Sequence, residues 1–307
     1  MNYYIIGIET SCDDTSLSIL KNDKVISCIT ISSEKKLAEF GGIIPEIASR
    51  EHVKNIMISF NKMLDESKIN ISDVNLISYT SNPGLPTCLH IGKIFAKTLS
   101  WYLNVELMEI DHIHAHIFSP FINNSEKIEY PFISLIVSGG TTSLFKVSSP
   151  TKIEVLNSTS DDALGEAYDK IGRYLNLPYP GGPSIDEVFN ENSITEKYRI
   201  PPATEPFSFS GIKSKIKKII EQSEKVNQIE LASNFQYWAI SYLISKIEHY
   251  SRETKSKIIS IGGGVSANKY FRNKISASNN IYIFPEKKYS CDNAAMIAFL
   301  SFLQKNY

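Results

Sequence analysis

The sequence predicts two related α/β domains, from its composition, from the alternation of strand and helix patterns, and from a hairpin-like segment that occurs twice. The chain has 307 residues, of which 42% are hydrophobic and 21% charged, as in a globular protein long enough for two domains of roughly 100–200 residues. Strand-like runs alternate with helical periodicity, which favours a largely parallel sheet in each domain with helices on its faces. This composition excludes disordered, fibrous and disulfide-scaffold proteins.

The first half opens with a strand, turn, strand unit. An apolar run at residues 3–8 is followed by a polar turn at 9–15 and a second apolar run at 17–20. The pattern after it predicts a helix with proline in its first turn, then a strand, then a helix, at residues 45–66, 74–80 and 90–103.

A similar unit opens the second half, with apolar runs at residues 132–137 and 144–147 around a small polar turn. A repeat period of about 130 residues indicates related domains rather than a solenoid. The pattern after it predicts helices at 162–175, 211–222, 229–252 and 267–277, strands at 257–261 and 281–284, and a final helix from about Asp292. Proline and glycine at residues 177–183 predict a turn that cannot continue a helix.

Charge and cysteine usage limit the partners and the compartment. Lys+Arg 32 against Asp+Glu 33 leaves a net charge of −1, so a nucleic acid would have to bind a local patch. The compact basic cluster is Lys213, Lys215, Lys217 and Lys218, which is either a solvated helix face or a contact for phosphates. The four cysteines form no CxxC pair and no run approaches the roughly 18 apolar residues of a membrane span, so we expect a cytoplasmic protein without a membrane partner.

The densest metal-competent run is DHIHAH at residues 111–116, with three of the six histidines. In a helix, His112 and His116 would share one face and His114 would point elsewhere. Two imidazoles supply only half of the ligands that a metal needs, and Asp292 is the candidate third ligand. Alternatively, the histidines are ordinary polar side chains. An HExxH protease is a weaker alternative, because Ile113 stands where the catalytic glutamate would be.

Glycine turns follow two predicted strands, at residues 138–140 and 260–268. Neither has Rossmann or Walker spacing, and each could be a tight connection, but two such turns in two similar domains favour a nucleotide held between the two domains. Glu9, Asp13 and Asp14 lie at the tip of the first hairpin. These carboxylates could simply be solvent-exposed groups that cap the hairpin. Alternatively, beside a metal or phosphate, they could orient a nucleophile or take a proton.

Motifs along nearly the whole chain resemble one family. They are GIETSCDDT at 7–15, GGIIPEIASREH at 41–52, PGL at 83–85, the histidines of 112–116, VSGG at 137–140, DDALGEAYDK at 161–170, YPGGP at 179–183, FSFSG at 207–211, GGVSAN at 263–268 and CDNAAM at 291–296. In this order they are similar to the tRNA N6-threonylcarbamoyladenosine transferase family in its bacterial and mitochondrial form (TsaD type), formerly named O-sialoglycoprotein endopeptidase.

The resemblance implies the actin-like ATPase fold of two ribonuclease-H-like domains. The first would span 1–110 and be rejoined by a C-terminal helix at 292–307, and the second would span 111–291 and carry most of the nucleotide pocket. It also implies one divalent metal, iron or zinc, held by His112, His116 and Asp292. The implied nucleotide contacts are Ile136, Val137, Ser138, Gly139, Gly140, Asp169, Gly182, Asp186 and Asn268.

The implied reaction moves the L-threonylcarbamoyl group from threonylcarbamoyl-AMP to N6 of the adenosine just 3′ of the anticodon. The tRNAs would be those that read codons beginning with A. A mixed anhydride is already activated, so no covalent nucleophile is required, and a metal with open positions can orient the acyl group. The adenine amine must lose a proton as it attacks, which makes Asp13 or Asp14 the expected base or orienting group, with Glu9 in the same turn.

Bacterial members of this family work with a noncatalytic paralogue and a small P-loop ATPase, whereas the mitochondrial form is a homodimer. This chain departs from the family at Thr141, where a histidine is usual, at Asp14, where many relatives have glutamate, and at Asn82, where glycine is frequent. It also ends soon after the Asp292 helix begins, so contacts made by a longer tail are expected to be minimal. A sugar or acetate kinase, an ATPase or a noncatalytic protein of the same fold would not explain the two histidines and Asp292.

Overall fold

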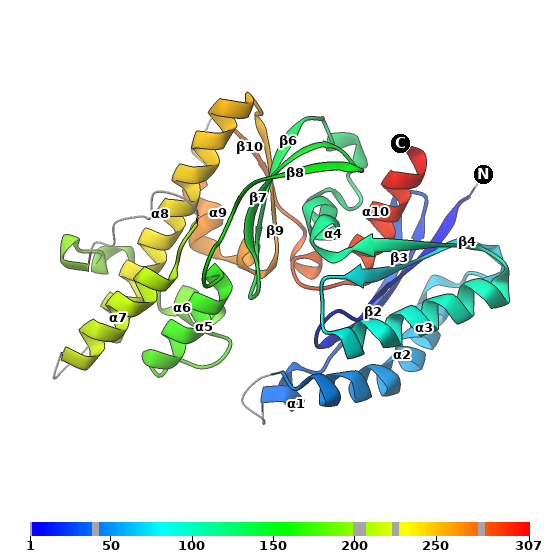
Figure 1. The fold of residues 1–307 in the computed structure, drawn as a ribbon, viewed down its shortest axis with the longest axis horizontal. Coiled ribbons are helices and arrows are strands. Elements are labelled where there is room, and N and C mark those ends of the chain that lie inside the picture. The colour runs from blue at the N-terminus through cyan, green and yellow to red at the C-terminus, as the bar shows by residue number, and fades with distance from the viewer. Residues whose placement is uncertain (1, 39–42, 199–206, 223–226, 276–279) are drawn as a thin grey trace. The chain divides into compact units, whose positions relative to one another are not determined.

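The structure, a computed structural model, describes residues 2–38, 43–198, 207–222, 227–275 and 280–307. Gly41 and Gly42, which begin the motif at 41–52, lie outside the described residues. The chain divides into two compact units: unit 1 spans Met1–Ile128, Ser149–Thr151 and Pro285–Tyr307, and unit 2 spans Glu129–Ser148 and Lys152–Phe284. Each unit contains a five-stranded sheet with helices against it (Figure 1).

The sheet of unit 1 combines an antiparallel meander with two parallel strands. Its order is β3-β2-β1-β4-β5, with β1 Tyr4–Glu9, β2 Asp14–Lys21, β3 Lys24–Ser32, β4 Val74–Asn82 and β5 Glu106–Asp111. β2 pairs antiparallel with β1 and β3, whereas β4 runs parallel to β1 and β5. β1 is central, which explains its continuous apolar sequence, because helices bury both faces of a central strand.

Helices cover both faces of this sheet. Their bounds are α1 Glu34–Ala38, α2 Pro45–Ser67, α3 Pro86–Leu103, α4 His112–Phe118 and α10 Ala294–Asn306. α2 and α3 pack against the face that carries Ile6 and Ile8. Gly7 points to the opposite face, because side chains alternate along a strand, and α10 lies against β1 there.

Unit 2 repeats the sheet topology of unit 1. Its order is β10-β9-β6-β7-β8, with β6 Phe132–Val137, β7 Thr142–Ser149, β8 Lys152–Ser158, β9 Ile258–Gly262 and β10 Ile281–Ile283. β6 pairs antiparallel with β7 and parallel with β9, as β1 does with β2 and β4. The prediction of two related α/β domains is therefore confirmed.

The helices of unit 2 surround one hydrophobic core. They are α5 Leu164–Tyr174, α6 Gly181–Val188, α7 Ser210–Gln222, α8 Gln228–Thr254 and α9 Lys269–Ile275. The end of the helix predicted at 267–277 lies outside the described residues. The core includes Leu135, Val137, Tyr168, Phe235 and Ile261. In the described part of the chain, none of the helices combines the length and the apolar character needed to cross a membrane.

Both sheets are mixed, so the prediction of largely parallel sheets is wrong. The hairpin strands run antiparallel in each half, and a further strand, β3 or β8, lies beside them at the sheet edge. The sequence pattern does not predict β3, β8 or β5, because an edge strand exposes part of its length and has no continuous apolar run.

Several helices begin at other residues than the sequence pattern predicts. α3 begins at Pro86 rather than at residue 90, and the starts of α6 and α10 also differ. α6 begins at Gly181, inside the run expected to be only a turn. Pro183 lies in its first turn, where the missing N–H removes no intrahelical hydrogen bond. α10 begins at Ala294 rather than at Asp292, because the Asn293 side chain caps it and accepts a hydrogen bond from the Met296 N–H at 3.0 Å.

The unit boundary differs from the predicted one, which gave residues 1–110 and 292–307 to the first domain and residues 111–291 to the second. Residues 111–128 and 285–291 belong to unit 1. The reason is α4, which packs against α10 and fully buries Ala115, Ile117 and Phe118. The metal-competent histidines and Asp292 therefore belong to one unit.

Candidate metal centre and nucleotide-binding turns

The carboxyl ends of β1, β4 and β5 meet at one edge of the unit 1 sheet, because these strands run parallel. The strands end in polar residues, Glu9, Asn82 and Asp111. α4 follows β5 directly, which places His112 at the same edge. The parallel pairing thus gathers polar side chains that lie far apart in the sequence.

Asp292 reaches this edge because α10 lies directly against β1. A Cβ on Gly7 would come within 2.3 Å of the Ala294 carbonyl oxygen, so a larger residue would force the helix away. The Ala294 N–H donates to Ser16 Oγ at 2.9 Å and ties the start of α10 to β2. These contacts hold the backbone next to Asp292 in place.

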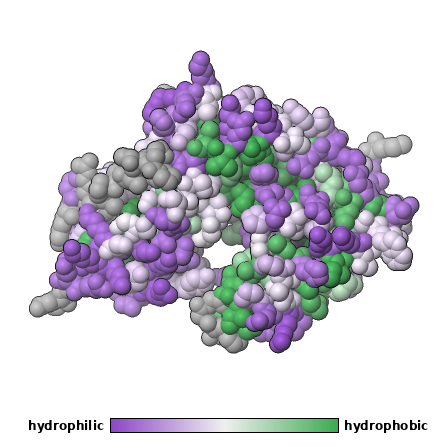
Figure 2. Space-filling model, viewed as in Figure 1, coloured by the Kyte–Doolittle hydropathy of each residue, from purple (hydrophilic) through white to green (hydrophobic). Residues whose placement is uncertain are grey.

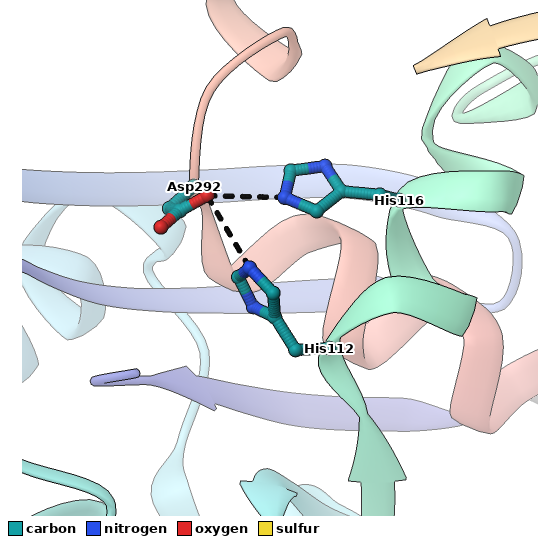
Figure 3. Close-up of side chains that lie close together, drawn as sticks. All are labelled: His112, His116 and Asp292. Atoms are coloured by element: carbon teal, nitrogen blue, oxygen red, sulfur yellow. Dashed lines mark hydrogen bonds and ion pairs between the residues drawn. The ribbon is translucent and has the colours of Figure 1, made fainter. Parts of the chain in front are cut away.

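The structure brings His112, His116 and Asp292 together. α4 places the two imidazoles one turn apart, with ring centroids separated by 4.7 Å. Both Nε2 atoms point to Asp292 Oδ1, at 3.5 Å from His112 and 3.0 Å from His116 (Figure 3). One ligand atom of each residue lies within 4.8 Å of the others. This donor set suits zinc or iron and leaves coordination positions open, so these residues fit such a metal.

Glu9 lies behind His112 and orients its ring. The fully buried carboxylate accepts a hydrogen bond from His112 Nδ1 at 3.1 Å. It also accepts hydrogen bonds from the Thr80 hydroxyl and the Ser11 N–H. Because Nδ1 faces Glu9, Nε2 faces Asp292, which is the usual arrangement for a metal-binding histidine.

The charges around His112 favour its protonated form. Burial opposes protonation, but the carboxylates of Glu9 and Asp292 raise the pKa of His112 to about 9. Burial also opposes the charged form of Asp292, but His112 and His116 hold the pKa of this carboxyl well below its usual range. A cation that binds here must displace a proton from His112, so metal binding should release protons and strengthen as the pH rises.

Asp13 lies in the turn between β1 and β2, and Asp14 begins β2. Burial raises the pKa of Asp14 to about 7; a hydrogen bond with Ser32 opposes this rise, and neighbouring carboxylates add to it. Burial and the charge of Asp292 also raise the pKa of Asp13. Within the described residues, Asp14 Oδ1 is buried without a hydrogen-bond partner. Carboxylates with a raised pKa suit proton transfer near neutral pH.

His52 supports this turn and is not among the predicted site residues. It is fully buried on α2, with Nε2 3.0 Å from the Cys12 carbonyl oxygen and Nδ1 2.8 Å from the Thr15 hydroxyl. Because a carbonyl oxygen can only accept, Nε2 donates to it, and in the neutral ring Nδ1 accepts from the Thr15 hydroxyl. Burial lowers the pKa of His52 and keeps the ring neutral. Its place in the motif at 41–52 is the signal that could have found it.

Asp111 and Asn82 hold the start of α4. Asp111 Oδ1 accepts a hydrogen bond from the His114 N–H at 2.9 Å and caps the helix. Its other oxygen accepts a hydrogen bond from Asn82 Nδ2 at 2.7 Å. Asn82 thus links β4 to the helix that carries both histidines.

Both glycine turns belong to unit 2, so the expectation of one turn in each of two similar domains is wrong. The turns meet at the carboxyl ends of β6 and β9, because these two strands run parallel. Gly263 has a φ of +83°, and a Cβ there would lie 2.4 Å from the Val137 carbonyl oxygen. Backbone conformation and close packing therefore both require glycine. The Ser138 N–H donates to the Thr141 carbonyl oxygen at 2.8 Å, and the Thr141 N–H donates to Ser138 Oγ at 3.1 Å, which closes the first turn.

The predicted nucleotide contacts at residues 136–140 are of two kinds. The side chains of Ile136 and Val137 are fully buried, so only their backbone could contact a ligand. Gly139 and Gly140 are exposed, and a Cβ on either would meet no atom within 4 Å. Their peptide groups are open to a phosphate or a sugar.

Asp169 organises the start of α6. Its Oδ1 accepts a hydrogen bond from the Gly181 N–H at 2.8 Å, which brings the neighbouring Gly182 close to α5. Burial raises the pKa of Asp169, and the backbone N–H groups of Gly181 and Gly182 oppose this rise. A Cβ on Gly182 would meet nothing within 4 Å, so the space beside its Cα is open, while its N–H faces Asp169.

Asp186 and Asn268 are joined through Gln236, a residue that the sequence analysis does not select. Asp186 Oδ1 accepts a hydrogen bond from Gln236 Nε2 at 3.0 Å, and Gln236 Oε1 accepts one from Asn268 Nδ2 at 2.8 Å. Gln236 is fully buried on α8. A single glutamine in an amphipathic helix carries no local signal, so only its contacts reveal it.

Internal ion pairs use part of the basic cluster predicted to contact tRNA. α7 carries its four lysines, Lys213, Lys215, Lys217 and Lys218. Lys213 pairs with Asp162, which also pairs with Lys170 at 2.9 Å. Lys217 Nζ lies 3.7 Å from Glu221 on the exposed side of the helix. Lys213 thus has a structural role, and its contact with tRNA stays a prediction.

Two solved structures show the fold class. The T. kodakarensis HypF structure matches with a TM-score of 0.65 at 15% identity, over 99% of this chain and 48% of that one, so this chain spans about half of it. Component A of the (R)-2-hydroxyglutaryl-CoA dehydratase of Acidaminococcus fermentans matches with a TM-score of 0.58 at 12% identity, over 99% and 100% of the two chains. At these identities the likeness concerns the fold alone, and the actin-like ATPase fold is confirmed.

Sequence comparisons identify the family. The family model described as tRNA N6-adenosine threonylcarbamoyltransferase matches residues 24–299. Proteins with this name from Malacoplasma penetrans (strain HF-2) and Ureaplasma parvum serovar 3 (strain ATCC 27815 / 27 / NCTC 11736) are 46% and 45% identical. These matches cover 99% and 100% of this chain, and 99% and 97% of the relatives. The chain therefore belongs to the tRNA N6-adenosine threonylcarbamoyltransferase family.

Proposed function

We propose that this acyltransferase moves the L-threonylcarbamoyl group from threonylcarbamoyl-AMP to N6 of the adenosine just 3′ of the tRNA anticodon and releases AMP. Its tRNAs would read codons that begin with A. Family membership supports acyl transfer to tRNA, and a tRNA substrate supports a cytoplasmic location. The convergence of His112, His116 and Asp292 carries the proposal, because a kinase or ATPase of this fold needs no such set of ligands.

One divalent cation, zinc or iron, would be held by His112, His116 and Asp292. When bound, it would supply positive charge that orients or polarises the carbamoyl and phosphate oxygens of the substrate. Glu9 would position His112 by holding Nδ1, so that Nε2 faces the site. We assign Glu9 this role instead of proton transfer, because its carboxylate is fully buried and accepts hydrogen bonds from protein groups on both oxygens.

Asp13 or Asp14 would take the proton that the adenine amine loses as it attacks the carbamoyl carbon. The mixed anhydride is already activated, with AMP as its leaving group, so the chain needs no covalent nucleophile. A pKa of about 7 suits Asp14 to general base catalysis near neutral pH. Asp13, whose pKa is also raised, is the alternative base.

Unit 2 would bind the nucleotide part of the substrate. The open peptide groups of Gly139 and Gly140 would approach its phosphate or sugar, and the open space beside the Gly182 Cα would admit it. Asp169, Asp186 and Asn268 would add polar side-chain contacts. The proposed contacts also include Ser138 and the backbone of Ile136 and Val137.

An apolar surface on α2 supports a protein partner. Val53 and Met57 are four residues apart, share one side of the helix, and are 57% and 50% exposed. Figure 2 shows hydrophobic residues at the surface over α2. Such a surface indicates a protein contact, and we assign it to the noncatalytic paralogue used by bacterial members of the family. A small P-loop ATPase is the second proposed partner.

Incubation with threonylcarbamoyl-AMP, unmodified tRNA and the partner proteins tests the function, with nucleosides analysed by mass spectrometry. We expect modified adenosine from wild type and from His114→Ala, which changes the same helix outside the proposed ligand set. His112→Ala should lose at least 90% of the product, since it removes one of three ligands (roughly 10-fold or more in rate). No product from wild type, or undiminished product from His112→Ala, would contradict the proposal.

A further inference from the structure

We infer that Gln236 sets the relative position of Asp186 and Asn268 and is thereby a positioning residue for the nucleotide. This inference rests on the proposed function, which makes Asp186 and Asn268 nucleotide contacts. Gln236 itself is fully buried, so it would act through these two residues.

The Gln236 amide connects side chains from separate elements. Its Nε2 donates to Asp186 Oδ1 on α6 at 3.0 Å. Its Oε1 accepts hydrogen bonds from Asn268 Nδ2 at 2.8 Å and from the Tyr168 hydroxyl of α5 at 3.3 Å. One buried amide therefore fixes α6 and the segment before α9 against α5 and α8.

One backbone N–H contacts each of Asp186 and Asn268 at the side-chain oxygen that does not face Gln236. Asp186 Oδ2 accepts a hydrogen bond from the Lys269 N–H at 3.0 Å. Asn268 Oδ1 accepts one from the Phe271 N–H at 2.8 Å, which holds the start of α9. Asp186 is only half-buried, and a carboxylate oxygen has more than one acceptor position, so it can still bind a ligand while these bonds hold it.

A neutral amide is the side chain that this position requires. It donates to a carboxylate and accepts from an amide at the same time. Leucine at Gln236 would leave Asp186 Oδ1 and Asn268 Nδ2 without this partner. Glutamate would place a second carboxylate about 3 Å from Asp186, and repulsion between two carboxylates so close favours the form in which they share one proton. They would share a proton at low pH and repel each other at high pH.

The fold does not depend on this amide alone. α8 is anchored in the unit 2 core by fully buried neighbours, including Phe235, Ala239 and Ile240. The Phe235 ring packs against Tyr168 with centroids 4.8 Å apart. Substitution of Gln236 should therefore move the polar contacts while the helix keeps its place.

Calorimetric titration with AMP between pH 5.5 and pH 8.5 tests the inference, with circular dichroism and thermal melts to check folding. For each variant, the dissociation constant is divided by that of wild type at the same pH. Gln236→Glu should bind AMP about 10–100-fold more weakly than wild type at pH 8.5. At pH 5.5 at least half of this loss, on a logarithmic scale, should disappear, because one shared proton restores the hydrogen bond between residue 236 and Asp186. Gln236→Leu should be weakened at both pH values.

Asn234→Asp is the matched control. Asn234 is fully buried on the same helix, but its side chain bonds to Ser193 and Thr195 rather than to the proposed nucleotide contacts. It should change AMP affinity by less than about 2-fold, because it leaves the Gln236 contacts intact. An equal loss from Asn234→Asp, or a Gln236→Glu loss that is absent or the same at both pH values, would overturn the inference.

The same titration separates this inference from the proposed function. Wild type that does not bind AMP contradicts the proposed nucleotide site, and the inference with it. Wild type that binds AMP while Asp186→Ala binds equally well contradicts the role of Asp186. If wild type binds AMP, Asp186→Ala binds it more weakly and Gln236→Glu binds it as wild type does, the inference is contradicted and the proposed function is not.

Discussion

The three carboxylates of the first hairpin have different surroundings, and these surroundings separate their roles. Glu9 is enclosed, with both oxygens bonded to protein groups. Asp14 is less buried than Glu9 but has one oxygen without a partner among the described residues. Residue type alone makes both candidates for acid–base chemistry. Their contacts favour positioning for Glu9 and proton transfer for Asp14.

Asp14→Asn should stabilise the metal-free protein at high pH. Burial raises the pKa of Asp14 from 3.8 to about 7, and the charges of Asp13, Asp292 and Glu34 add to this rise against the hydrogen bond with Ser32. The folded state thus retains a proton that the unfolded chain loses, so ionisation of Asp14 destabilises the fold progressively between about pH 4 and pH 7. We expect Asp14→Asn to exceed wild type by on the order of 1–3 kcal/mol at pH 8 and by almost nothing at pH 4.

Urea unfolding in the presence of a chelator measures this difference. Asp23→Asn is the control, and its effect on stability should have the opposite sign. Burial raises the pKa of Asp23, but hydrogen bonds from Ser125 and Lys24 outweigh burial, and the pKa is lowered. That variant should lose a little stability above pH 4. A free energy of unfolding for Asp14→Asn that is equal to wild type at pH 8 would show that Asp14 ionises without cost.

At the scale of elements, α4 is positioned by its ends and its packing. A helix of seven residues is too short to be stable by itself. Asp111 caps its first turn, Asn82 holds the Asp111 carboxylate, and the buried Phe118 anchors its last turn. The distance between the two proposed histidine ligands and Asp292 depends on these contacts.

Asp111→Ala should weaken zinc binding, because the start of α4 and the His112 backbone would lose their cap. We expect about a 10-fold loss of affinity and a destabilisation of about 1 kcal/mol. Asn82→Ala should act in the same direction with a smaller effect. Competition with a chromophoric chelator at fixed pH measures the affinity without reference to activity.

Asn70→Ala is the matched control for the cap. Asn70 caps a short 3-10 helix by accepting a hydrogen bond from the Ser72 N–H at 3.1 Å, and it lies before β4, away from the carboxyl edge. It should lower stability without changing zinc affinity. Zinc binding by Asp111→Ala as tight as that of wild type would mean that packing alone positions α4.

At the scale of the whole molecule, a net charge of −1 limits binding of tRNA. Lys213 is paired with Asp162 and Lys217 lies near Glu221, which further reduces the positive charge that the basic cluster presents. A protein without a strong positive field binds nucleic acid weakly at physiological salt. We therefore expect the chain to depend on its partners to recruit tRNA.

Filter binding of tRNA at two salt concentrations tests this expectation. The chain alone should bind weaker than about 1 μM at about 150 mM salt and tighter at low salt. Lys217→Ala with Lys218→Ala should reduce the salt dependence, whereas Lys305→Ala should not, since Lys305 pairs with Glu106 at the far end of β5 from His112. Submicromolar binding by the chain alone at about 150 mM salt would refute partner dependence.

Local patterns in the sequence determined the repeated hairpin, most helices and the helical spacing of His112 and His116, because periodicity is a property of neighbouring residues. The motifs determined the family. Edge strands such as β3 were not predicted, because an exposed edge strand has no continuous apolar run.

Only the tertiary structure decided the geometry in which distant residues meet. It brought Asp292 to the histidines through the close approach of α10 to Gly7, enclosed Glu9 behind His112, paired Lys213 with Asp162, and joined Asp186 to Asn268 through Gln236. Each of these contacts joins side chains from different elements. No local pattern encodes such a contact, because it arises only when the strands pair in parallel and the helices pack on them.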